Sequence, residues 1–194
     1  MKKTFKKTKK PNFKKTVKKI ETKVTKLLDH AKVKYKTISH KVVYTAHDAA
    51  QTTKKKLSEI AKVVLVKADK DFVLIVLPAG KYVDLKAVQK ALASAKGGSA
   101  SGGKKVSMAS EKDITKYLKT KVGLLHPFGS EYPAPVASLR YGASNLQTLL
   151  DKGMARSKKM IASAGTFTDS VEVGLKDFQK IVKPMLGNFA KSKK

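Results

Sequence analysis

The chain has 194 residues, of which 43 are basic and 14 acidic, giving a formal net charge of +29, and it contains no cysteine. This length suits one domain with a single core, and the absence of cysteine excludes disulfides, thiol nucleophiles and thiolate metal sites. The charge indicates a polyanionic partner. Because only Arg140 and Arg156 are arginines, contacts to backbone phosphates are favoured over reading of base edges. A lysine-rich genome would explain the ratio of lysine to arginine equally well, but not the net charge.

The apolar runs are too short for a membrane span, since the longest covers only Phe72 to Leu77. The N-terminus carries lysines but no hydrophobic segment typical of a secretory signal. We therefore expect a soluble, cytoplasmic protein with no membrane partner.

The N-terminal region is predicted in two parts. Residues 1–13 combine high charge with few apolar groups, which is typical of a disordered basic arm. A helix is predicted from Lys14, because apolar residues recur at helical spacing opposite a face of lysines: Val17, Ile20, Val24, Leu27, Leu28 and Ala31. That lysine face is either an RNA contact or a solvated surface.

The middle of the chain alternates between strand and helix patterns. The predicted strands are 33–38 and 41–44 around His40, then 61–67 and 71–77, the last two joined as a hairpin by an ADKD turn. The predicted helices are 46–54 after Thr45, 85–95 capped by Asp84, and 111–120, which begins at the capping pair Ser110 and Asp113.

Residues 96–105 consist mainly of glycine, serine and lysine. Because each side alone lacks the elements of a complete domain, we expect a flexible loop within one domain spanning 14–194 rather than an interdomain linker. Beyond it, the patterns predict strands near 135–139, 158–163 and 169–173 and helices near 143–151 and 175–183. Interspersed helices and hairpins indicate an α+β fold with a mixed β-sheet core and peripheral helices.

The segment GLLHPFG, Gly123 to Gly129, combines glycines at both ends with an internal proline. Such a segment forms a stiff loop that a ligand can approach closely, with backbone N–H groups left free. Lys62, at the head of the apolar strand KVVLVK, adds a positive charge. The two together suit a small carbonyl or phosphate group, and the overall charge indicates a substrate attached to a nucleic acid.

Four stretches in order resemble the YbaK/prolyl-tRNA-synthetase-associated domain family, the stand-alone aminoacyl-tRNA deacylases. They are TISHKVVYTA at 37–46, AKVVLVKADKDFVLIVLPAGKYVDL at 61–85, GLLHPFG, and SAGTFTDSVEVGLKDFQKIV at 163–182. Lys62 matches the catalytic lysine of the family, Lys67 matches a second basic position, and Gly123 and Pro127 match its G-x-x-x-P loop.

The resemblance implies a trans-editing hydrolase that deacylates mischarged aminoacyl-tRNA at the ester of the terminal ribose. It implies Lys62 as catalytic residue and Gly123, His126, Pro127, Phe128 and Gly129 as substrate-binding residues. It also implies aminoacyl-tRNA as partner, bound mainly through backbone phosphates, with an aminoacyl-tRNA synthetase as a further partner. No cofactor is expected, and the histidines lack HExxH spacing, so the enzyme is expected to be metal-independent.

One departure concerns the strand after the loop. Members of the family that act on cysteinyl-tRNA place an aspartate there, whereas this chain has PVASLR at 135–140, with Ser138 and Leu139 in the matching region. The amino acid removed is therefore left open. Two alternatives also remain: a non-catalytic tRNA- or RNA-binding protein that retains the domain, and a ribosomal or nucleoid protein, which would explain the charge but not the loop.

Overall fold

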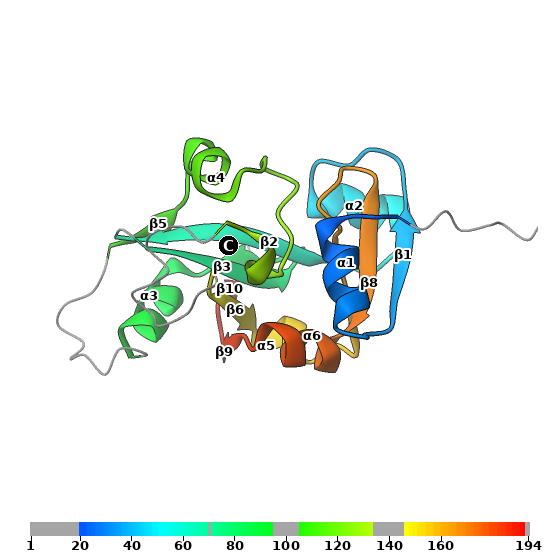
Figure 1. The fold of residues 1–194 in the computed structure, drawn as a ribbon. Helices are drawn as coiled ribbons and strands as arrows, with labels where there is room; N and C mark the ends of the chain where they lie inside the picture. Colours follow the sequence, from blue (N-terminus) through cyan, green and yellow to red (C-terminus); the bar gives the residue numbers. More distant parts are fainter. Residues whose placement is uncertain (1–19, 70, 95–104, 134–145, 193–194) are drawn as a thin grey trace, which may run out of the picture.

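The computed structural model describes residues 20–69, 71–94, 105–133 and 146–192. The predicted arm at 1–13, nearly all of the glycine/serine loop and the predicted strand near 135–139 lie outside these residues. The described chain forms two main sheets with helices around them (Figure 1), which confirms the expected α+β class.

The larger sheet has five strands in the order β5-β2-β3-β6-β9. The predicted hairpin forms its centre, and the ladders are antiparallel from β5 to β3 and parallel from β3 to β9. The sheet is therefore mixed, as expected. Its strands are β2 (Ala61–Ala68), β3 (Asp71–Pro78), β5 (Val106–Met108), β6 (Thr148–Asp151) and β9 (Met185–Gly187).

The second sheet is antiparallel, in the order β1-β8-β7, with β1 (Tyr35–Ser39), β7 (Lys159–Ser163) and β8 (Asp169–Gly174). A parallel bridge between Ile60 and Ile161 joins it to the residues that lead into β2, and the N–H of Ile161 donates to the carbonyl of Glu59 at 2.8 Å. The start of β2 therefore lies at the junction of the two sheets.

Helices α3 (Leu85–Ser94) and α4 (Glu111–Leu118) cover opposite faces of the five-stranded sheet (Figure 1). Val88 and Leu92 of α3 pack against Val66, Val73 and Ile75, whereas Ile114 and Leu118 of α4 pack against Leu65, Phe72 and Leu74. Because both faces are covered, every residue of β3 is buried. This explains why the strand is apolar without alternation.

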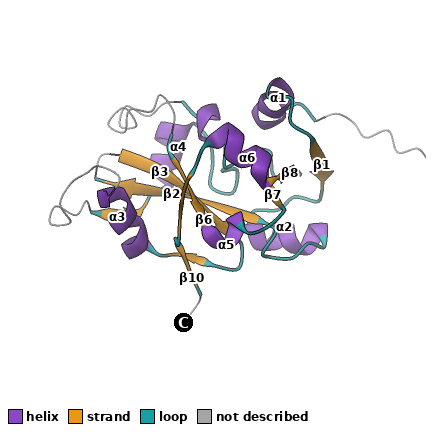
Figure 2. Ribbon diagram, turned by 90° about the horizontal axis from the view of Figure 1, so that it is seen from below, coloured by secondary structure: helices purple, strands orange, loops and turns teal. Residues whose placement is uncertain are grey.

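The remaining helices surround the junction. They are α1 (Lys23–His30), α2 (Ala46–Thr53), α5 (Lys152–Ala155) and α6 (Leu175–Val182), with a 3₁₀ turn η1 at Gly129–Glu131. Helices α5 and α6 lie along the same side of the molecule (Figures 1 and 2). Phe178 of α6 belongs to a cluster that includes Val76 from one sheet and Val171 from the other. This cluster therefore links the two sheets.

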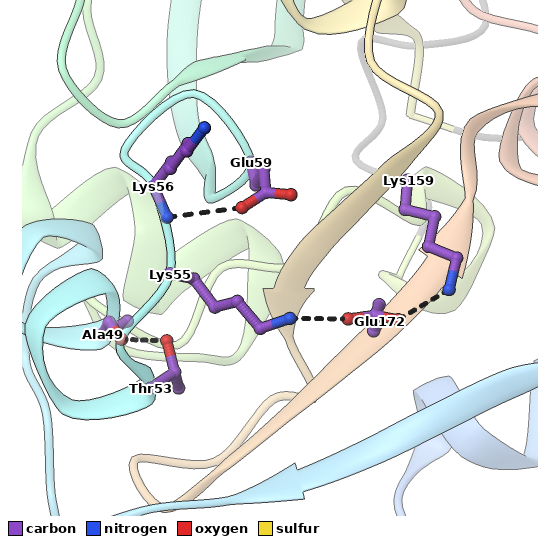
Figure 3. Close-up of polar contacts among 7 residues, drawn as sticks. All are labelled: Ala49, Thr53, Lys55, Lys56, Glu59, Lys159 and Glu172. Carbon is purple, nitrogen blue, oxygen red and sulfur yellow. Dashed lines mark hydrogen bonds and ion pairs between the residues drawn. The ribbon is translucent and has the colours of Figure 1, made fainter.

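Polar contacts hold the segment between α2 and β2 (Figure 3). Glu172 on β8 accepts from Lys55 at 3.2 Å and from Lys159 on β7 at 3.0 Å. The N–H of Lys56 donates to the carboxylate of Glu59 at 3.3 Å. A separate antiparallel pair is formed by two short strands, β4 (Tyr82–Val83) and β10 (Ala190–Lys191). The ion pair of Lys55 with Glu172 thus holds the segment that leads into β2 to the second sheet.

The helix caps predicted at Asp84 and Ser110 are confirmed, and Thr45 caps α2 in the same way. Thr45 and Ser110 each form a reciprocal capping box, with Asp48 and Asp113, and the carboxylate of Asp84 accepts from the N–H groups of Lys86 and Ala87. The hydroxyl hydrogen bonds hold the pKa of Asp48 and of Asp113 below their ordinary values, and burial opposes them in both cases. The strands near 158–163 and 169–173 and the last helix are also confirmed.

Three predicted elements are wrong. Residues 41–44 form no strand, because they lie against the turn between β7 and β8, where only Val43 donates to Phe167. Residues 148–151, predicted as helix, are the buried strand β6, since they pair on both sides, with β3 and β9. Of the helix predicted from Lys14, residues 20–22 are not helical and α1 begins at Lys23, because Thr22 forms a capping box with Thr25; residues 14–19 lie outside the described part of the chain.

Asp151 ties the C-terminal segment to the large sheet. Its buried carboxylate accepts from the N–H groups of Gly153 at 2.8 Å, Phe189 at 2.7 Å and Ala190 at 2.9 Å. We expect Asp151→Ala to lower the free energy of unfolding by about 3 kcal/mol, because it leaves three N–H groups without their acceptor. Urea unfolding measures this. The control Asp84→Ala removes a helix cap and should cost only about 1 kcal/mol; equal losses would contradict this role of Asp151.

Candidate functional site

A cavity of about 250 Å³ lies at the junction of the two sheets. Strand β5 pairs only with Val66 to Ala68 of β2, so among the described residues the first half of β2 has no strand partner on that side. This strand edge forms one wall, at Ile60 to Val64. The other walls come from the segment 40–46 with Ala49, from Val122, Gly123 and Leu125, and from Ile161 to Ser163 with Thr166 and Ser170.

Lys62 lines this cavity from the edge of β2 and is half-buried. Its ammonium donates to the carbonyl of Lys81 and lies 4.9 Å from the centre of the Tyr82 ring. Burial lowers the pKa of the Lys62 ammonium below its ordinary value. An ammonium has three protons to donate, and only one contact of this ammonium is to a backbone oxygen. Lys81 and Tyr82 thus hold the ammonium in place, and it has further protons with no acceptor among the described residues.

Lys67, the other basic residue of β2, lies on the opposite face of the strand. Its ammonium is 5.9 Å from the centre of the Phe72 ring, and its charge helps to lower the pKa of Asp113 on α4. It does not line the cavity. The strand parity noted in the sequence thus separates the two lysines.

Gly123 and Leu125 bring the GLLHPFG loop to the cavity. Gly123 has φ +88°, and a Cβ there would lie 2.7 Å from the carbonyl oxygen of Tyr44. Glycine is therefore required both by the backbone conformation and by the close approach of the Tyr44 backbone. Within the described part of the chain, no acceptor is found for the N–H groups of Gly123 and Leu125. Both are available donors in residues that line the cavity.

The other predicted binding residues of the loop, His126, Pro127, Phe128 and Gly129, are buried and do not line the cavity. Phe128 packs edge-on against Phe178, with ring centres 5.6 Å apart. A Cβ at Gly129 would lie 2.0 Å from the carbonyl oxygen of Leu146. These residues anchor the loop in the hydrophobic core. Gly123 and Leu125 are thereby held in place in the wall of the cavity.

His126 stacks on Tyr132, with ring centres 4.2 Å apart. The Tyr132 hydroxyl accepts from the N–H of His126 at 2.6 Å and donates to its carbonyl at 3.1 Å. Burial lowers the pKa of His126 from 6.5 to about 4, and the charge of Lys23 acts in the same direction. Burial also raises the pKa of Tyr132. The imidazole is therefore neutral at pH 7.

The buried imidazole makes stability depend on pH. The unfolded chain binds a proton here below about pH 6.5, whereas the folded chain stays neutral until about pH 4. Stability from this group is thus present above pH 6.5 and is lost as the pH falls toward 4. Between pH 7 and pH 5 we expect a loss of about 2 kcal/mol. Urea unfolding at both pH values should show this loss in the native chain and not in His126→Gln; the same loss in both would contradict it.

The wall opposite β2 carries hydroxyl groups and His40. The His40 ring bonds through Nε2 to the buried Ser170 hydroxyl at 2.9 Å and through Nδ1 to the carbonyl of Lys41 at 2.8 Å. Ser163 and Thr166 line the same wall. The family-like stretches at 37–46 and 163–182 contain these residues, but neither was singled out as part of a site.

Asp169 holds the turn between β7 and β8 in shape. Its carboxylate accepts from the hydroxyls of Thr168 at 2.8 Å, Thr166 at 2.9 Å and Ser39 at 3.0 Å. Burial acts to raise the pKa of this carboxyl, but these hydrogen bonds outweigh it and the pKa lies below its ordinary value. The hydroxyl-bearing wall is thus fixed by an ionised carboxylate beneath it.

Comparison with known proteins identifies the class of this fold and cavity. The family model of the aminoacyl-tRNA editing domain matches residues 40–181, and the chain belongs to this family. The resemblance noted in the sequence is thereby confirmed. Among individual proteins, the chain is similar to the prolyl-tRNA editing protein ProX of Acetoanaerobium sticklandii, with 26% identity over 158 residues, 80% of this chain and 86% of that protein.

Solved structures show the same fold. Hypothetical protein APE2540 superposes with a TM-score of 0.71 at 17% identity, covering 87% of this chain and 99% of that one. A proposed trans-editing enzyme for prolyl tRNA synthetase superposes with a TM-score of 0.65 at 15% identity, covering 88% and 96%. At these identities the likeness concerns the fold alone.

No group of three or more histidine, aspartate or glutamate side chains among the described residues could hold a metal ion. None of the described helices is long and apolar enough to cross a membrane. The region matching the aspartate-bearing strand of related deacylases, 135–140, lies outside the described residues.

Proposed function

We propose that this protein is a trans-editing hydrolase that removes a wrongly attached amino acid from tRNA by cleaving its ester with the terminal ribose. The observation that carries the proposal is that Lys62 and Gly123, from distant parts of the chain, line one cavity. Membership of the editing-domain family supplies the reaction class.

The cavity is matched to an aminoacyl group rather than to a whole nucleotide. Its volume of about 250 Å³ lies just below the range of about 300–1,000 Å³ usual for drug-sized ligands. Valine, alanine and isoleucine side chains contribute apolar walls, and serine and threonine hydroxyls contribute hydrogen-bonding groups. A small amino acid fits these walls, and its ester oxygen then points to the rim where Lys62 lies.

Lys62 anchors the ribose–phosphate end of the substrate. Its ammonium is positioned by the Lys81 carbonyl and the Tyr82 ring, and its two remaining protons, which have no acceptor among the described residues, can donate to a phosphate or ribose oxygen. Because the group is half-buried, its attraction for an anion is screened less than that of an exposed lysine. This separates Lys62 from the other lysines of the chain.

The N–H groups of Gly123 and Leu125 stabilise the charge that develops on the ester carbonyl oxygen. Water attacks the carbonyl carbon, the bond to the ribose oxygen breaks, and that oxygen takes a proton, which yields a free amino acid and uncharged tRNA. The ester is already activated, so positioned water and preorganised donors are sufficient. Gly123 suits this role because its conformation is fixed by the adjacent Tyr44 backbone.

A substrate panel tests the proposal. Purified protein is incubated with tRNAs that carry different amino acids, and release is measured beside Lys62→Ala. We expect release of at least one small amino acid that depends on Lys62. Binding of tRNA without release from any of them would contradict hydrolysis and identify the protein as a non-catalytic tRNA-binding member of the family.

We propose that the lysines at the N-terminus add affinity for tRNA without reading its sequence. Residues 1–13 contain six lysines, and phosphate contacts of this kind weaken steeply with salt. Deleting residues 1–13 should weaken tRNA binding on the order of tenfold at low salt and less at high salt, and leave hydrolysis of a minimal acceptor-stem substrate less affected. Filter binding across a salt series measures this; equal affinity at all salt concentrations would rule it out.

A further inference from the structure

Lys62 also lines a second hollow, on the other side of the β2 edge. This groove has a volume of about 660 Å³ and shares both Lys62 and Val64 with the cavity described above. Val64, Val83 and Leu85 provide an apolar floor. The cavity and the groove therefore lie next to each other, with the ammonium of Lys62 between them.

The groove combines an aromatic surface with cations. Tyr82 and Met108 both line it and are 49% and 52% exposed, unusually high values for large apolar side chains. Lys62 and Lys191 line it as well, and Lys81 donates to the Ser192 hydroxyl at its rim at 2.8 Å. None of the described residues that line the groove is acidic. A ligand that fits has a flat apolar part and a negative charge.

We propose that this groove binds the terminal nucleotide of the tRNA, with its base against Tyr82 and Met108 and its phosphate between Lys62 and Lys191. The proposal rests on the proposed function, because it places the two halves of one substrate on either side of Lys62. The aminoacyl group enters the small cavity, the ribose crosses the unpaired edge of β2, and the base lies in the groove. Stacking on an aromatic ring accepts any base, so this contact adds affinity for the 3′ end rather than recognition of a particular tRNA.

The Tyr82 ring contacts Lys62 and also faces the groove. It lies against the Lys62 ammonium, and the half-exposed ring presents apolar surface to the groove. Its backbone pairs with that of Lys191 through the β4–β10 ladder, so the ring and the second lysine start from neighbouring positions on paired strands. We thus assign Tyr82 as a substrate-positioning residue.

Steady-state kinetics with the full chain and an aminoacyl-tRNA that the protein hydrolyses test this assignment. Tyr82→Ala should raise KM by a factor on the order of 10 to 100 and change kcat less, whereas Tyr82→Phe should keep a near-native KM. Met108→Glu should raise KM too, since it replaces apolar surface under the base and puts a negative charge into a groove that receives an anionic nucleotide. The matched control is Leu186→Ala, which removes an equally exposed apolar side chain (50%) that lines neither hollow and should leave KM unchanged.

Direct binding separates this proposal from the proposed function. AMP should bind the native chain and lose affinity in Tyr82→Ala, and ribose 5-phosphate should bind both equally. Loss of AMP binding without any deacylation would leave the groove assignment standing and refute the hydrolase. Deacylation that depends on Lys62, with unchanged KM and AMP affinity in both Tyr82→Ala and Met108→Glu, would refute the groove assignment and indicate that another part of this chain or a protein covers it.

Discussion

Lys62→Ala is expected to lower the rate of aminoacyl-tRNA deacylation by a factor on the order of 100 to 1,000, as removal of one preorganised electrostatic partner commonly does. The side chain lies at the rim of the cavity and makes one backbone hydrogen bond and one ring contact. The Lys62 side chain is not part of the hydrophobic core, so the variant should keep the native fold. Single-turnover release of a labelled amino acid measures the rate, and circular dichroism checks the fold.

The control for this prediction is Lys67→Ala. Lys67 belongs to the same strand and carries the same charge, but it faces α4 and does not line the cavity. Its removal lowers the net charge by the same amount and should leave the rate within a factor of about two. Equal losses in both variants would show that general positive charge, rather than the placement of Lys62, supports the reaction.

Gly129→Ala is expected to cost about 3 kcal/mol of unfolding free energy, the upper part of the range for overpacked sites. A Cβ there would lie 2.0 Å from the Leu146 carbonyl oxygen and 3.2 Å from the Thr148 hydroxyl. Backbone cannot move aside as a flexible side chain can, and Thr148 begins the buried strand β6. The η1 turn and β6 would therefore have to separate.

Denaturant unfolding measures this cost against Gly80→Ala. A Cβ at Gly80 would lie 3.6 Å from Leu57, which is ordinary contact, and alanine reduces the freedom of the unfolded chain. Gly80→Ala should therefore be neutral or slightly stabilising. Native-like stability of Gly129→Ala would show that the loop is not anchored through this residue.

The central hairpin and the helix caps could be predicted because their signals are local. The run KVVLVKADKDFVLIVL contains two buried strands and a turn, and Thr45, Asp84 and Ser110 act on N–H groups within three residues. Strand β6 was missed because its form depends on parallel partners far along the chain, β3 and β9. Strands β9 and β10 were missed because segments of three and two residues carry no periodicity.

Part of the site was predictable as well, because strand parity and a glycine in a loop are also local signals. Strand parity separates Lys62 from Lys67, and the glycine at position 123 marks a backbone that side chains cannot adopt. The burial of His126 and Phe128 could not be read from the sequence, because a histidine beside a proline resembles an exposed loop. Only tertiary packing against Tyr132 and Phe178 turns this part of the loop inward.

A structure of the chain bound to an aminoacyl-adenosine 5′-phosphate, with an amide in place of the ester, tests the central claim most directly. The account predicts the amino acid in the cavity beside Gly123 and a phosphate or ribose oxygen within about 4 Å of the Lys62 ammonium, the usual limit for an ion pair. An analogue bound elsewhere, with the cavity empty and Lys62 still on the Lys81 carbonyl, would contradict it.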